Sequence, residues 1–311
     1  MAYRRRRRRR RKFNKDKLKV IIVLVIFAIC YYNKYGLSFS AAFNEEESTV
    51  VPVSTSGNLE VEFLDVGQAD SILIRDNGKN MIIDAGNNED GRKLVEYFKN
   101  LGITRFEYVI GSHAHEDHIG GMDDIIKNFE VGHFYMPDAY TTTLTFEEVL
   151  DALDSKQLKF EIPKIGETFT LNDAVIDVLY TEDNSANLND SSIVLKLKYG
   201  NVKFLFMGDA ESKTEKSILE QDIKADVIKL GHHGSSYATT LGFLNKVDPK
   251  YAIIEVGKNN AYHHPHPSTL NKLKNKDIKV YRTDKDGTII CTTDGVNINF
   301  TTLKTDTNGG N

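Results

Sequence analysis

The sequence predicts a single α/β domain that contains two sheets with helices on the outside. Short apolar or alternating runs, which are typical of strands, fill the start of the folded part, and strands mixed with amphipathic helices follow. The same order of elements recurs in the second half, with no shorter repeat. Eight of the nine histidines lie in three short segments, each of which follows a predicted strand. Because strand ends can meet at one rim of a layered domain, we expect these histidines to form one site.

The charged residues are divided unevenly along the 311 residues. Residues 1–19 carry twelve basic residues and one acidic residue, whereas residues 20–311 carry 28 basic and 43 acidic residues, a net charge of about −15. The overall net charge of −4 is therefore an average of two unlike parts. The hydrophobic content of 40% is ample for a core. The two cysteines, Cys30 and Cys291, provide no disulfide framework and are distant from the histidine segments.

The N-terminal segment indicates export. Residues 4–11 are eight consecutive arginines, which cannot pack in a core, so we expect residues 1–17 to form a basic cytoplasmic tail. The apolar run that follows predicts that residues 18–37 are a signal anchor or a signal peptide, with the anchor preferred. We therefore expect a single-pass protein of the cell membrane whose domain lies outside, or a secreted protein if the chain is cleaved near residue 40. The alternative, a nucleic-acid-binding tail in the cytoplasm, leaves the apolar run unexplained.

The remainder of the chain divides into a linker, a domain and a tail. Residues 38–57 lack core periodicity and are expected to be the linker, residues 58–303 the folded domain and residues 304–311 the tail. Residues 59–66 begin with an alternation of apolar and acidic residues that predicts a half-buried strand. The predicted strands cover residues 59–66, 71–74, 81–83, 106–110, 131–136, 169–171, 175–180, 192–199, 202–207, 227–230, 251–256, 279–281, 288–291 and 296–300. The predicted helices cover residues 89–101, 122–129, 146–153, 211–219, 241–247 and 270–274.

The densest group of candidate ligands lies in residues 111–121, Gly-Ser-His-Ala-His-Glu-Asp-His-Ile-Gly-Gly, between a predicted strand and a predicted helix. In an extended segment, His113 and His115 point to the same side and can share one metal ion. Asp117 and His118 are adjacent, so a turn must splay them before they can hold a second ion. Imidazole and carboxylate together suit zinc, manganese or iron. The alternative is a polar surface loop that is rich in histidine, but four candidate ligands in six residues favour a metal site.

Further motifs follow other predicted strands. Asp84 and Asp209 each lie at a strand end, residues 231–236 read Gly-His-His-Gly-Ser-Ser, residues 264–267 read His-Pro-His-Pro, and residues 63–71 read Phe-Leu-Asp-Val-Gly-Gln-Ala-Asp-Ser. With the histidine loop, these motifs resemble the metallo-β-lactamase superfamily, and more narrowly the hydrolase domain of ComEC-type competence proteins, over nearly the whole predicted domain. The resemblance implies an αββα sandwich, the metallo-β-lactamase fold, with a metal site at the rim between the sheets.

The resemblance also implies two divalent metal ions, zinc or manganese, as cofactors. Asp117 and His118 would bind the second ion, and Asp209 would bridge the two ions. Either His232 or His233 would complete the second site, and the sequence does not decide between them.

The first site departs from the family pattern. His113 and His115 would bind the first ion, but most members of the superfamily have another histidine between this cluster and the bridging aspartate. His133 is the only histidine in that interval, and we expect it to be structural. Asn189 lies where the missing ligand would be expected, and its amide oxygen would be a weaker ligand. We therefore expect a weak first site that favours manganese.

Five further residues are expected to support the site. Asp84 would orient an imidazole through its second nitrogen, or else it is an ordinary turn or cap carboxylate. Ser235 and Ser236 would bind a substrate phosphate or cap the next turn. His264 and His266 flank a proline and would contact the substrate or donate a proton, or else their loop caps the following helix.

The implied chemistry is hydrolysis. A water shared by two divalent ions has a pKa of about 7, and the resulting hydroxide would attack phosphorus or a carbonyl carbon. Asp117 and Asp209 would hold the ions, and His264 or His266 would protonate the leaving oxygen, so these four are the expected catalytic residues. We therefore expect an exported or membrane-anchored metal-dependent hydrolase. The resemblance implies a phosphodiesterase that degrades DNA.

The charge of the domain argues against a polyanionic substrate, because an acidic domain lacks the basic groove that gives salt-dependent affinity for nucleic acid. Lys229, Lys258 and Lys272 could still line a path for DNA. The alternatives are a smaller phosphodiester, such as choline phosphate on a cell-wall polymer, or a lactone or amide. A non-catalytic binding module tethered to the membrane would require loss of the metal ligands, yet all but one of the expected set are present. The sequence identifies no protein partner.

Overall fold

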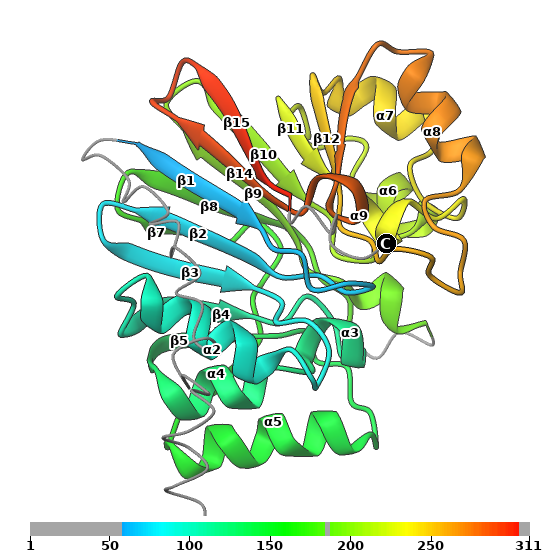
Figure 1. Ribbon diagram of the computed structural model, residues 1–311. Coiled ribbons are helices and arrows are strands. Elements are labelled where there is room, and N and C mark those ends of the chain that lie inside the picture. Colours follow the sequence, from blue (N-terminus) through cyan, green and yellow to red (C-terminus); the bar gives the residue numbers. More distant parts are fainter. Residues whose placement is uncertain (1–57, 184–186, 305–311) are drawn as a thin grey trace, which may run out of the picture. The chain divides into compact units, whose positions relative to one another are not determined.

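The computed structural model describes residues 58–183 and 187–304 (Figure 1). The predicted cytoplasmic tail, signal segment and linker lie outside these residues, as does nearly all of the predicted C-terminal tail. None of the helices in the described part of the chain has the length and apolar character needed to cross a bilayer.

Two sheets form the centre of the domain (Figure 1). The first has eight strands, in the order β15 (Ile298–Leu303), β14 (Thr288–Thr293), β1 (Leu59–Phe63), β2 (Ile72–Asp76), β3 (Lys79–Ile83), β4 (Arg105–Ile110), β5 (Glu130–Tyr135) and β6 (Phe160–Glu161). The second has seven, in the order β13 (Lys279–Arg282), β12 (Tyr251–Ile254), β11 (Val227–Lys229), β10 (Val202–Phe206), β9 (Val194–Tyr199), β8 (Ala174–Tyr180) and β7 (Thr168–Leu171). The strands β3 to β6 run parallel to one another, as do β10 to β13.

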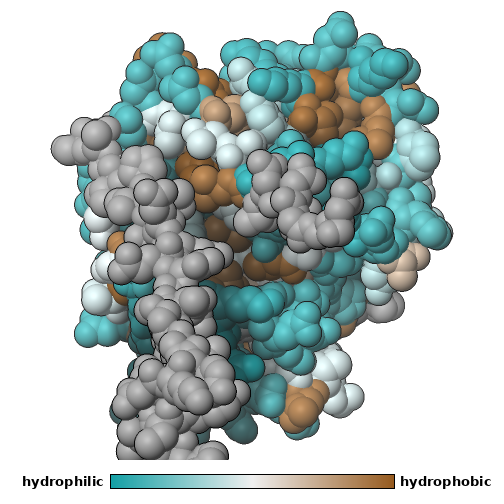
Figure 2. Space-filling view, in the orientation of Figure 1, coloured by the Kyte–Doolittle hydropathy of each residue, from teal (hydrophilic) through white to brown (hydrophobic). Residues whose placement is uncertain are grey.

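Apolar side chains fill the space between the sheets. Phe63 of the first sheet and Phe206 of the second lie with ring centroids 6.3 Å apart, inside one continuous cluster that includes residues of both sheets. The view in Figure 2 shows mostly hydrophilic residues at the surface, with hydrophobic residues gathered mainly toward its middle. Burial of these apolar side chains stabilises the sandwich by about 25 cal/mol for each Å² removed from water.

Helices cover the outer face of each sheet. The helices α2 (Gly91–Asn100), α4 (Met122–Asn128) and α5 (Leu144–Ser155) pack on the first sheet through side chains such as Phe98, Ile125 and Val149. The helices α7 (Leu241–Val247) and α8 (Pro267–Lys274) pack on the second sheet through Leu244 and Leu273. The order of layers is therefore helix, sheet, sheet, helix, as expected from the sequence (Figure 1). The remaining short helices are α3 (Glu116–Ile119), α6 (Ser212–Ser217), α9 (Thr283–Asp286), and the 3₁₀ turns η2 (Leu188–Ser191) and η3 (Gly231–Gly234).

Every predicted strand and helix has a counterpart in the structure, with shifts of a few residues at the ends. The strand β6, the helices α3 and α9, and the two 3₁₀ turns were not predicted. Each of these elements has only two to four residues, which is too short to show a period in the sequence.

The prediction that the first strand is half-buried is wrong, because β1 is buried along its whole length. It lies between β14 and β2, and its acidic residues Glu60 and Glu62 point toward the outer helical layer, where both pair with Arg75. The hydroxyl of Tyr97 in α2 also donates to Glu62. Burial raises the pKa of Glu62 to about 7. The alternation of apolar and acidic residues in β1 therefore reflects a buried charged face on this strand, and not a face exposed to water.

The strand ends of both sheets converge on one rim. The carbonyl of Ser112, just after β4, accepts from the backbone N–H of Ile193 (2.9 Å), which joins the two sheets. Gly208, just after β10, accepts from the backbone N–H of His232 (3.2 Å). The loop after β4 is thereby tied to the start of β9, and the loops after β10 and β11 are tied to each other. These three loops carry most of the predicted site residues.

Gly120, near the end of the histidine loop, has a steric role. Gly120 donates its backbone N–H to the carbonyl of Gly86 (2.9 Å), which holds the loop against the segment after β3. A Cβ atom on Gly120 would lie 2.2 Å from the backbone of Asn87 and Asn88, a distance that no side chain tolerates. The close approach of these two segments therefore requires glycine at this position.

Candidate metal centre

The histidine loop is shaped by the single turn of α3. His115 is extended (φ −89°, ψ 150°) and is the residue before the turn. The backbone N–H of His118 returns to the carbonyl of His115 (3.1 Å), so the chain reverses and the side chains of Asp117 and His118 separate. The sequence required such a turn, because adjacent residues cannot otherwise face one site.

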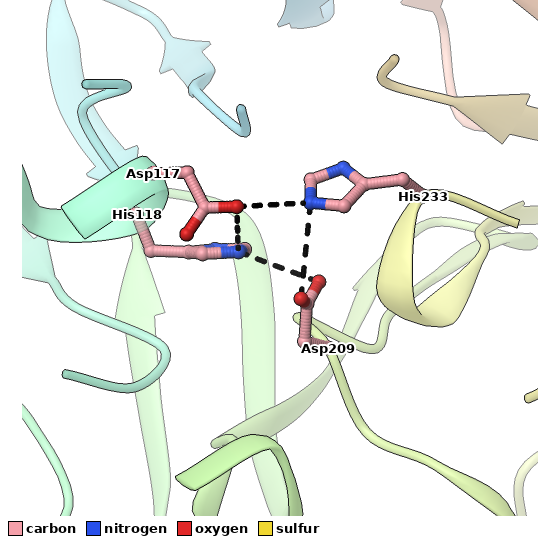
Figure 3. Close-up of side chains that lie close together, drawn as sticks. All are labelled: Asp117, His118, Asp209 and His233. Carbon is pink, nitrogen blue, oxygen red and sulfur yellow. Dashed lines mark hydrogen bonds and ion pairs between the residues drawn. The ribbon is translucent and has the colours of Figure 1, made fainter. Parts of the chain in front are cut away.

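Four side chains from three loops converge beyond this turn (Figure 3). One ligand atom from each of Asp117, His118, Asp209 and His233 lies within 4.8 Å of the others. His118 Nε2 is 3.4 Å from Asp209 Oδ1. His233 Nε2 is 3.3 Å from Asp117 Oδ2 and 3.7 Å from Asp209 Oδ2. Of the two neighbouring histidines after β11, the structure thus brings His233 into this cluster.

The cluster has the properties of a cation site. His118 Nε2 and Asp209 Oδ1 are buried and make no hydrogen bond with any residue that the structure describes. Burial alone would lower the pKa of His233, but Asp209 and Asp70 outweigh burial and raise it to about 10. Burial also opposes the charged form of Asp209, yet His118 and His233 lower its pKa well below the usual value. The carboxylates therefore attract positive charge to this point, and two imidazoles with two carboxylates suit zinc, manganese or iron.

The backbone of η3 separates the two neighbouring histidines. His232 (φ 48°) and His233 (φ 50°) are both left-handed, a conformation that is unfavourable for residues other than glycine. This reversal directs His233 toward Asp117 and Asp209, whereas His232 Nδ1 lies 2.9 Å from Glu211 Oε1. Strain of this kind is common where a side chain must be held at a functional site.

Asp84 lies against the far side of His118. Its Oδ2 is 2.8 Å from His118 Nδ1, and its carboxylate accepts from the backbone N–H and the hydroxyl of Ser112, each at 2.7 Å. Because Nδ1 is bonded to this carboxylate, Nε2 is the nitrogen that remains to bind a cation. Asp84 thus contacts one nitrogen of an imidazole, and its role as a support for a metal ligand stays a prediction.

His113 and His115 face one another, as their spacing predicted. His113 Nε2 lies 2.9 Å from His115 Nδ1. His113 is fully buried, and burial lowers its pKa well below the usual value, so the ring is neutral. These two residues form a pair beside the four-residue cluster and are not members of it.

The predicted weak ligand Asn189 lies in η2. Its amide nitrogen donates to Glu211 Oε1 (3.2 Å), and its buried Oδ1 has no hydrogen-bond partner in the described part of the chain. His232 contacts the same carboxylate oxygen, and its Nε2 lies 3.9 Å from Asp209 Oδ2. Glu211 therefore connects Asn189 with His232, a role that the sequence did not indicate because Glu211 begins no recognisable motif.

The cluster opens into a cavity of about 310 Å³. Neither of the two serines expected to bind a substrate phosphate lines it. Ser235 is fully buried, and its hydroxyl accepts from the backbone N–H of Tyr237, so the predicted substrate contact is wrong. Ser236 is exposed, and its backbone N–H donates to His266 Nδ1 (2.8 Å). The residues that line the cavity are Gln68, His115, Glu116, Asp117, Asn189, Asp209, His232, His233, Tyr262 and His264.

The two histidines of the His-Pro-His segment have different positions. His264 lines the cavity, whereas His266 is the residue that precedes α8 and accepts from Ser236. Their ring planes lie at 85° to one another. The proton-donor prediction therefore does not fit His266. His133, predicted to be structural, lies on β5, stacks on Tyr108 and contacts Glu161 away from the cavity.

A buried ion pair beneath the cluster was not predicted. Lys229 at the end of β11 is 1% exposed and pairs with Asp70. Lys229 Nζ also donates to the carbonyl of Gly208 (3.1 Å). Burial alone would lower the pKa of Lys229, but Asp70 and other carboxylates raise it, so the ammonium remains charged. The prediction that Lys229 could line a path for DNA is wrong, because its side chain points inward.

This ion pair contacts the cluster at several points. Asp70 Oδ1 lies 3.3 Å from His233 Nδ1, and Asp70 Oδ2 lies 3.7 Å from His118 Nδ1. The backbone N–H of Asp70 donates to the carbonyl of Asp117 (3.1 Å), and the carbonyl of Glu255 lies 2.9 Å from His233 Nδ1. Asp70 belongs to the motif at residues 63–71, but its pairing with a lysine 159 residues away has no local signal in the sequence.

Comparison with known proteins identifies the family. The sequence profile described as "Metallo-beta-lactamase superfamily" matches residues 64–257. The chain belongs to this superfamily. Members of the metallo-beta-lactamase superfamily are metal-dependent hydrolases, and the chain is accordingly assigned as one.

Individual relatives agree with this assignment. The chain is 34% identical over 252 residues to ComE operon protein 3 of Bacillus subtilis (strain 168). The matched region covers 74% of this chain and 32% of that relative. It is 28% identical over 230 residues to competence protein ComA of Neisseria gonorrhoeae, and this matched region covers 72% of this chain and 31% of that relative. The chain spans about a third of the length of these relatives. The metallo-beta-lactamase fold protein YhfI from Bacillus subtilis has the same fold, with a TM-score of 0.55 and 12% identity over 76% of this chain and 100% of that chain.

The buried ion pair yields a first prediction. Lys229→Met leaves the Asp70 carboxylate buried without its partner, which should lower the free energy of unfolding by about 3–5 kcal/mol. Urea unfolding followed by circular dichroism measures this change. Lys258→Met removes the same charge at an exposed position and should change stability by less than about 0.5 kcal/mol. Equal effects of the two substitutions would show that the Lys229–Asp70 pair is not a structural support.

The contact between Asp84 and His118 yields a second prediction. Asp84→Asn weakens the hydrogen bond that orients the imidazole, so the affinity for Mn²⁺ or Zn²⁺ should fall by about 10- to 100-fold. Competition with a chelating dye measures the dissociation constant. Asp151→Asn, at an exposed position on α5, makes the same charge change and should leave the affinity unaltered. An unaltered affinity in Asp84→Asn would contradict the supporting role of this carboxylate.

Proposed function

We propose that the chain is an exported, metal-dependent phosphodiesterase that cleaves single-stranded DNA. The observation that carries the proposal is the convergence of Asp117, His118, Asp209 and His233 beside a cavity that three of them line. Membership of a hydrolase superfamily supports the reaction class, and similarity to proteins named for competence supports DNA as the substrate.

The four side chains would hold a divalent ion, and the residues present fit such an ion. When bound, the ion would supply Lewis acidity toward a phosphoryl oxygen and would make a water acidic enough to attack near neutral pH. Asp117 and Asp209 contribute negative charge to this point, while Asp84 keeps His118 in the orientation that presents Nε2. His113, His115, His232 and Asn189 lie beside the cluster and are the proposed holders of the other, weaker ion.

His264 is the proposed contact to the leaving oxygen. It lies on the cavity wall, and its buried Nδ1 makes no hydrogen bond within the described residues. Burial and the neighbouring histidines lower the pKa of His264 to about 4, so the ring is neutral at pH 7. A general acid that works near neutral pH needs a pKa close to 7. His264 therefore acts in this proposal by hydrogen bonding to the substrate and not by releasing a full proton.

One observation favours a second candidate, a small phosphodiester such as a choline phosphate group. None of the described residues that line the cavity is lysine or arginine, and Glu116 adds a further negative charge. Neutralising DNA phosphates normally relies on such basic side chains. A short substrate would need fewer of them, because only one phosphate must lie near the ion.

The test compares the two substrate classes. Full-length protein in detergent, loaded with Mn²⁺ or Zn²⁺, should hydrolyse single-stranded DNA and bis-para-nitrophenyl phosphate. Asp209→Asn should lower both rates by roughly 100-fold or more, whereas Asp151→Asn should not. Cleavage of only the small diester would favour the second candidate. If the metal binds but neither substrate is hydrolysed, the phosphodiesterase proposal is incorrect.

The location outside the cell is also a proposal, which the apolar segment at residues 18–37 and the preceding arginines support. Protease added to intact cells should then digest the folded domain while a cytoplasmic control protein survives. Survival of the domain in intact cells, with digestion after lysis, would contradict export.

A further inference from the structure

Three aromatic rings form a stack that leads from the candidate metal centre to solvent. His233, a member of the four-residue cluster, lies with its ring centroid 6.2 Å from that of His264, at an interplanar angle of 27°. His264 in turn stacks on Tyr262, with centroids 5.7 Å apart and an angle of 23°. These distances and near-parallel planes are in the range of offset stacking. The stack ends at Tyr262, which is 65% exposed and lines the cavity.

The outer ring has features of a ligand contact. A tyrosine with one face on His264 and so large an exposed fraction leaves apolar surface open at the mouth of the cavity. Exposed aromatic side chains beside a concave site are typical of recognition surfaces. The other strongly exposed tyrosines among the described residues differ, because Tyr237 does not line the cavity and Tyr140 packs edge-on against Phe146.

The charge of the cavity limits how a substrate can gain affinity there. Its described lining residues include Glu116, Asp117 and Asp209 but no lysine or arginine that could contact phosphates flanking the scissile one. The release of counterions from phosphates, which drives most nucleic-acid binding, therefore contributes little to the affinity for a strand at the mouth of this cavity. Stacking of a base on an aromatic ring is independent of phosphate charge and contributes about 1–3 kcal/mol for each base.

We propose that Tyr262 is a stacking platform for a nucleobase of the strand whose phosphate lies over the four-residue cluster. This inference rests on the proposed function and makes it more specific, since the substrate becomes an unpaired strand whose base can leave its neighbours. Tyr262 then determines which substrates bind, and the four-residue cluster carries out the hydrolysis. The ring, and not the hydroxyl, makes the contact.

The experiment uses two oligonucleotides of equal length, one with a base at every position and one with abasic tetrahydrofuran units throughout. Full-length protein loaded with Mn²⁺ is assayed for binding by fluorescence anisotropy and for cleavage by gel. Tyr262→Ala should raise Kd and KM for the base-bearing strand by about 5- to 150-fold and leave kcat nearly unchanged. The same substitution should not alter binding or cleavage of the abasic strand.

Two variants serve as controls. Tyr262→Phe keeps the ring and should behave like the wild-type protein, which separates stacking from a hydrogen bond by the hydroxyl. Tyr237→Ala removes a tyrosine of similar exposure (68%) outside the cavity and should have no effect on either strand.

The outcomes distinguish this inference from the proposed function. If Tyr262→Ala binds and cleaves the base-bearing strand as well as the wild-type protein does, the stacking platform is overturned, and the phosphodiesterase proposal is unaffected. Equal losses on both strands would also overturn it, because the effect would then not depend on bases. Binding that depends on Tyr262 and on bases, without cleavage, would support the platform and contradict the phosphodiesterase. Failure to bind or cleave either strand would contradict both.

Discussion

The buried pair of Lys229 and Asp70 is the interaction on which the site depends. Two opposite charges with almost no exposure to water are stable only when each keeps its partner and further polar contacts. Here the ammonium also binds the carbonyl of Gly208, and the carboxylate contacts His118 and His233. One ion pair thus touches the loops after β4, β10 and β11. The candidate ligands are therefore held in place by their contacts with this ion pair as well as by the backbone of their own loops.

The layered architecture explains how such distant residues meet. His118 follows a strand of the first sheet, and Asp209 and His233 follow strands of the second. The hydrogen bond from Ile193 to Ser112 joins the sheets directly beneath the site. Gly120 allows the histidine loop to lie against the segment after β3, which carries Asp84. The rim between the sheets therefore holds rigid polar groups from both layers, as a site that must keep ligand geometry requires.

The parts of the site that the sequence could predict are those with local signals. His113, His115, Asp117 and His118 lie within six residues, and their need for a turn follows from their spacing alone. The left-handed backbone at residues 232 and 233, which brings His233 and not His232 to the cluster, has no comparable signal. Similarly, nothing in the neighbourhood of Lys229 indicates that its side chain points inward, since this depends on which face of β11 meets Asp70. Ser235 and His266 were misplaced because the loop folds on itself through backbone contacts that sequence cannot reveal.

The central claim is that Asp117, His118, Asp209 and His233 hold a divalent metal ion. Diffraction from crystals soaked in Mn²⁺ or Zn²⁺, with data collected on both sides of the metal absorption edge, tests it most directly. The account predicts an anomalous peak among these four side chains, with His118 coordinating through Nε2, and no such peak in Asp209→Asn. A peak elsewhere, or none in a protein whose fold is intact, would contradict the account.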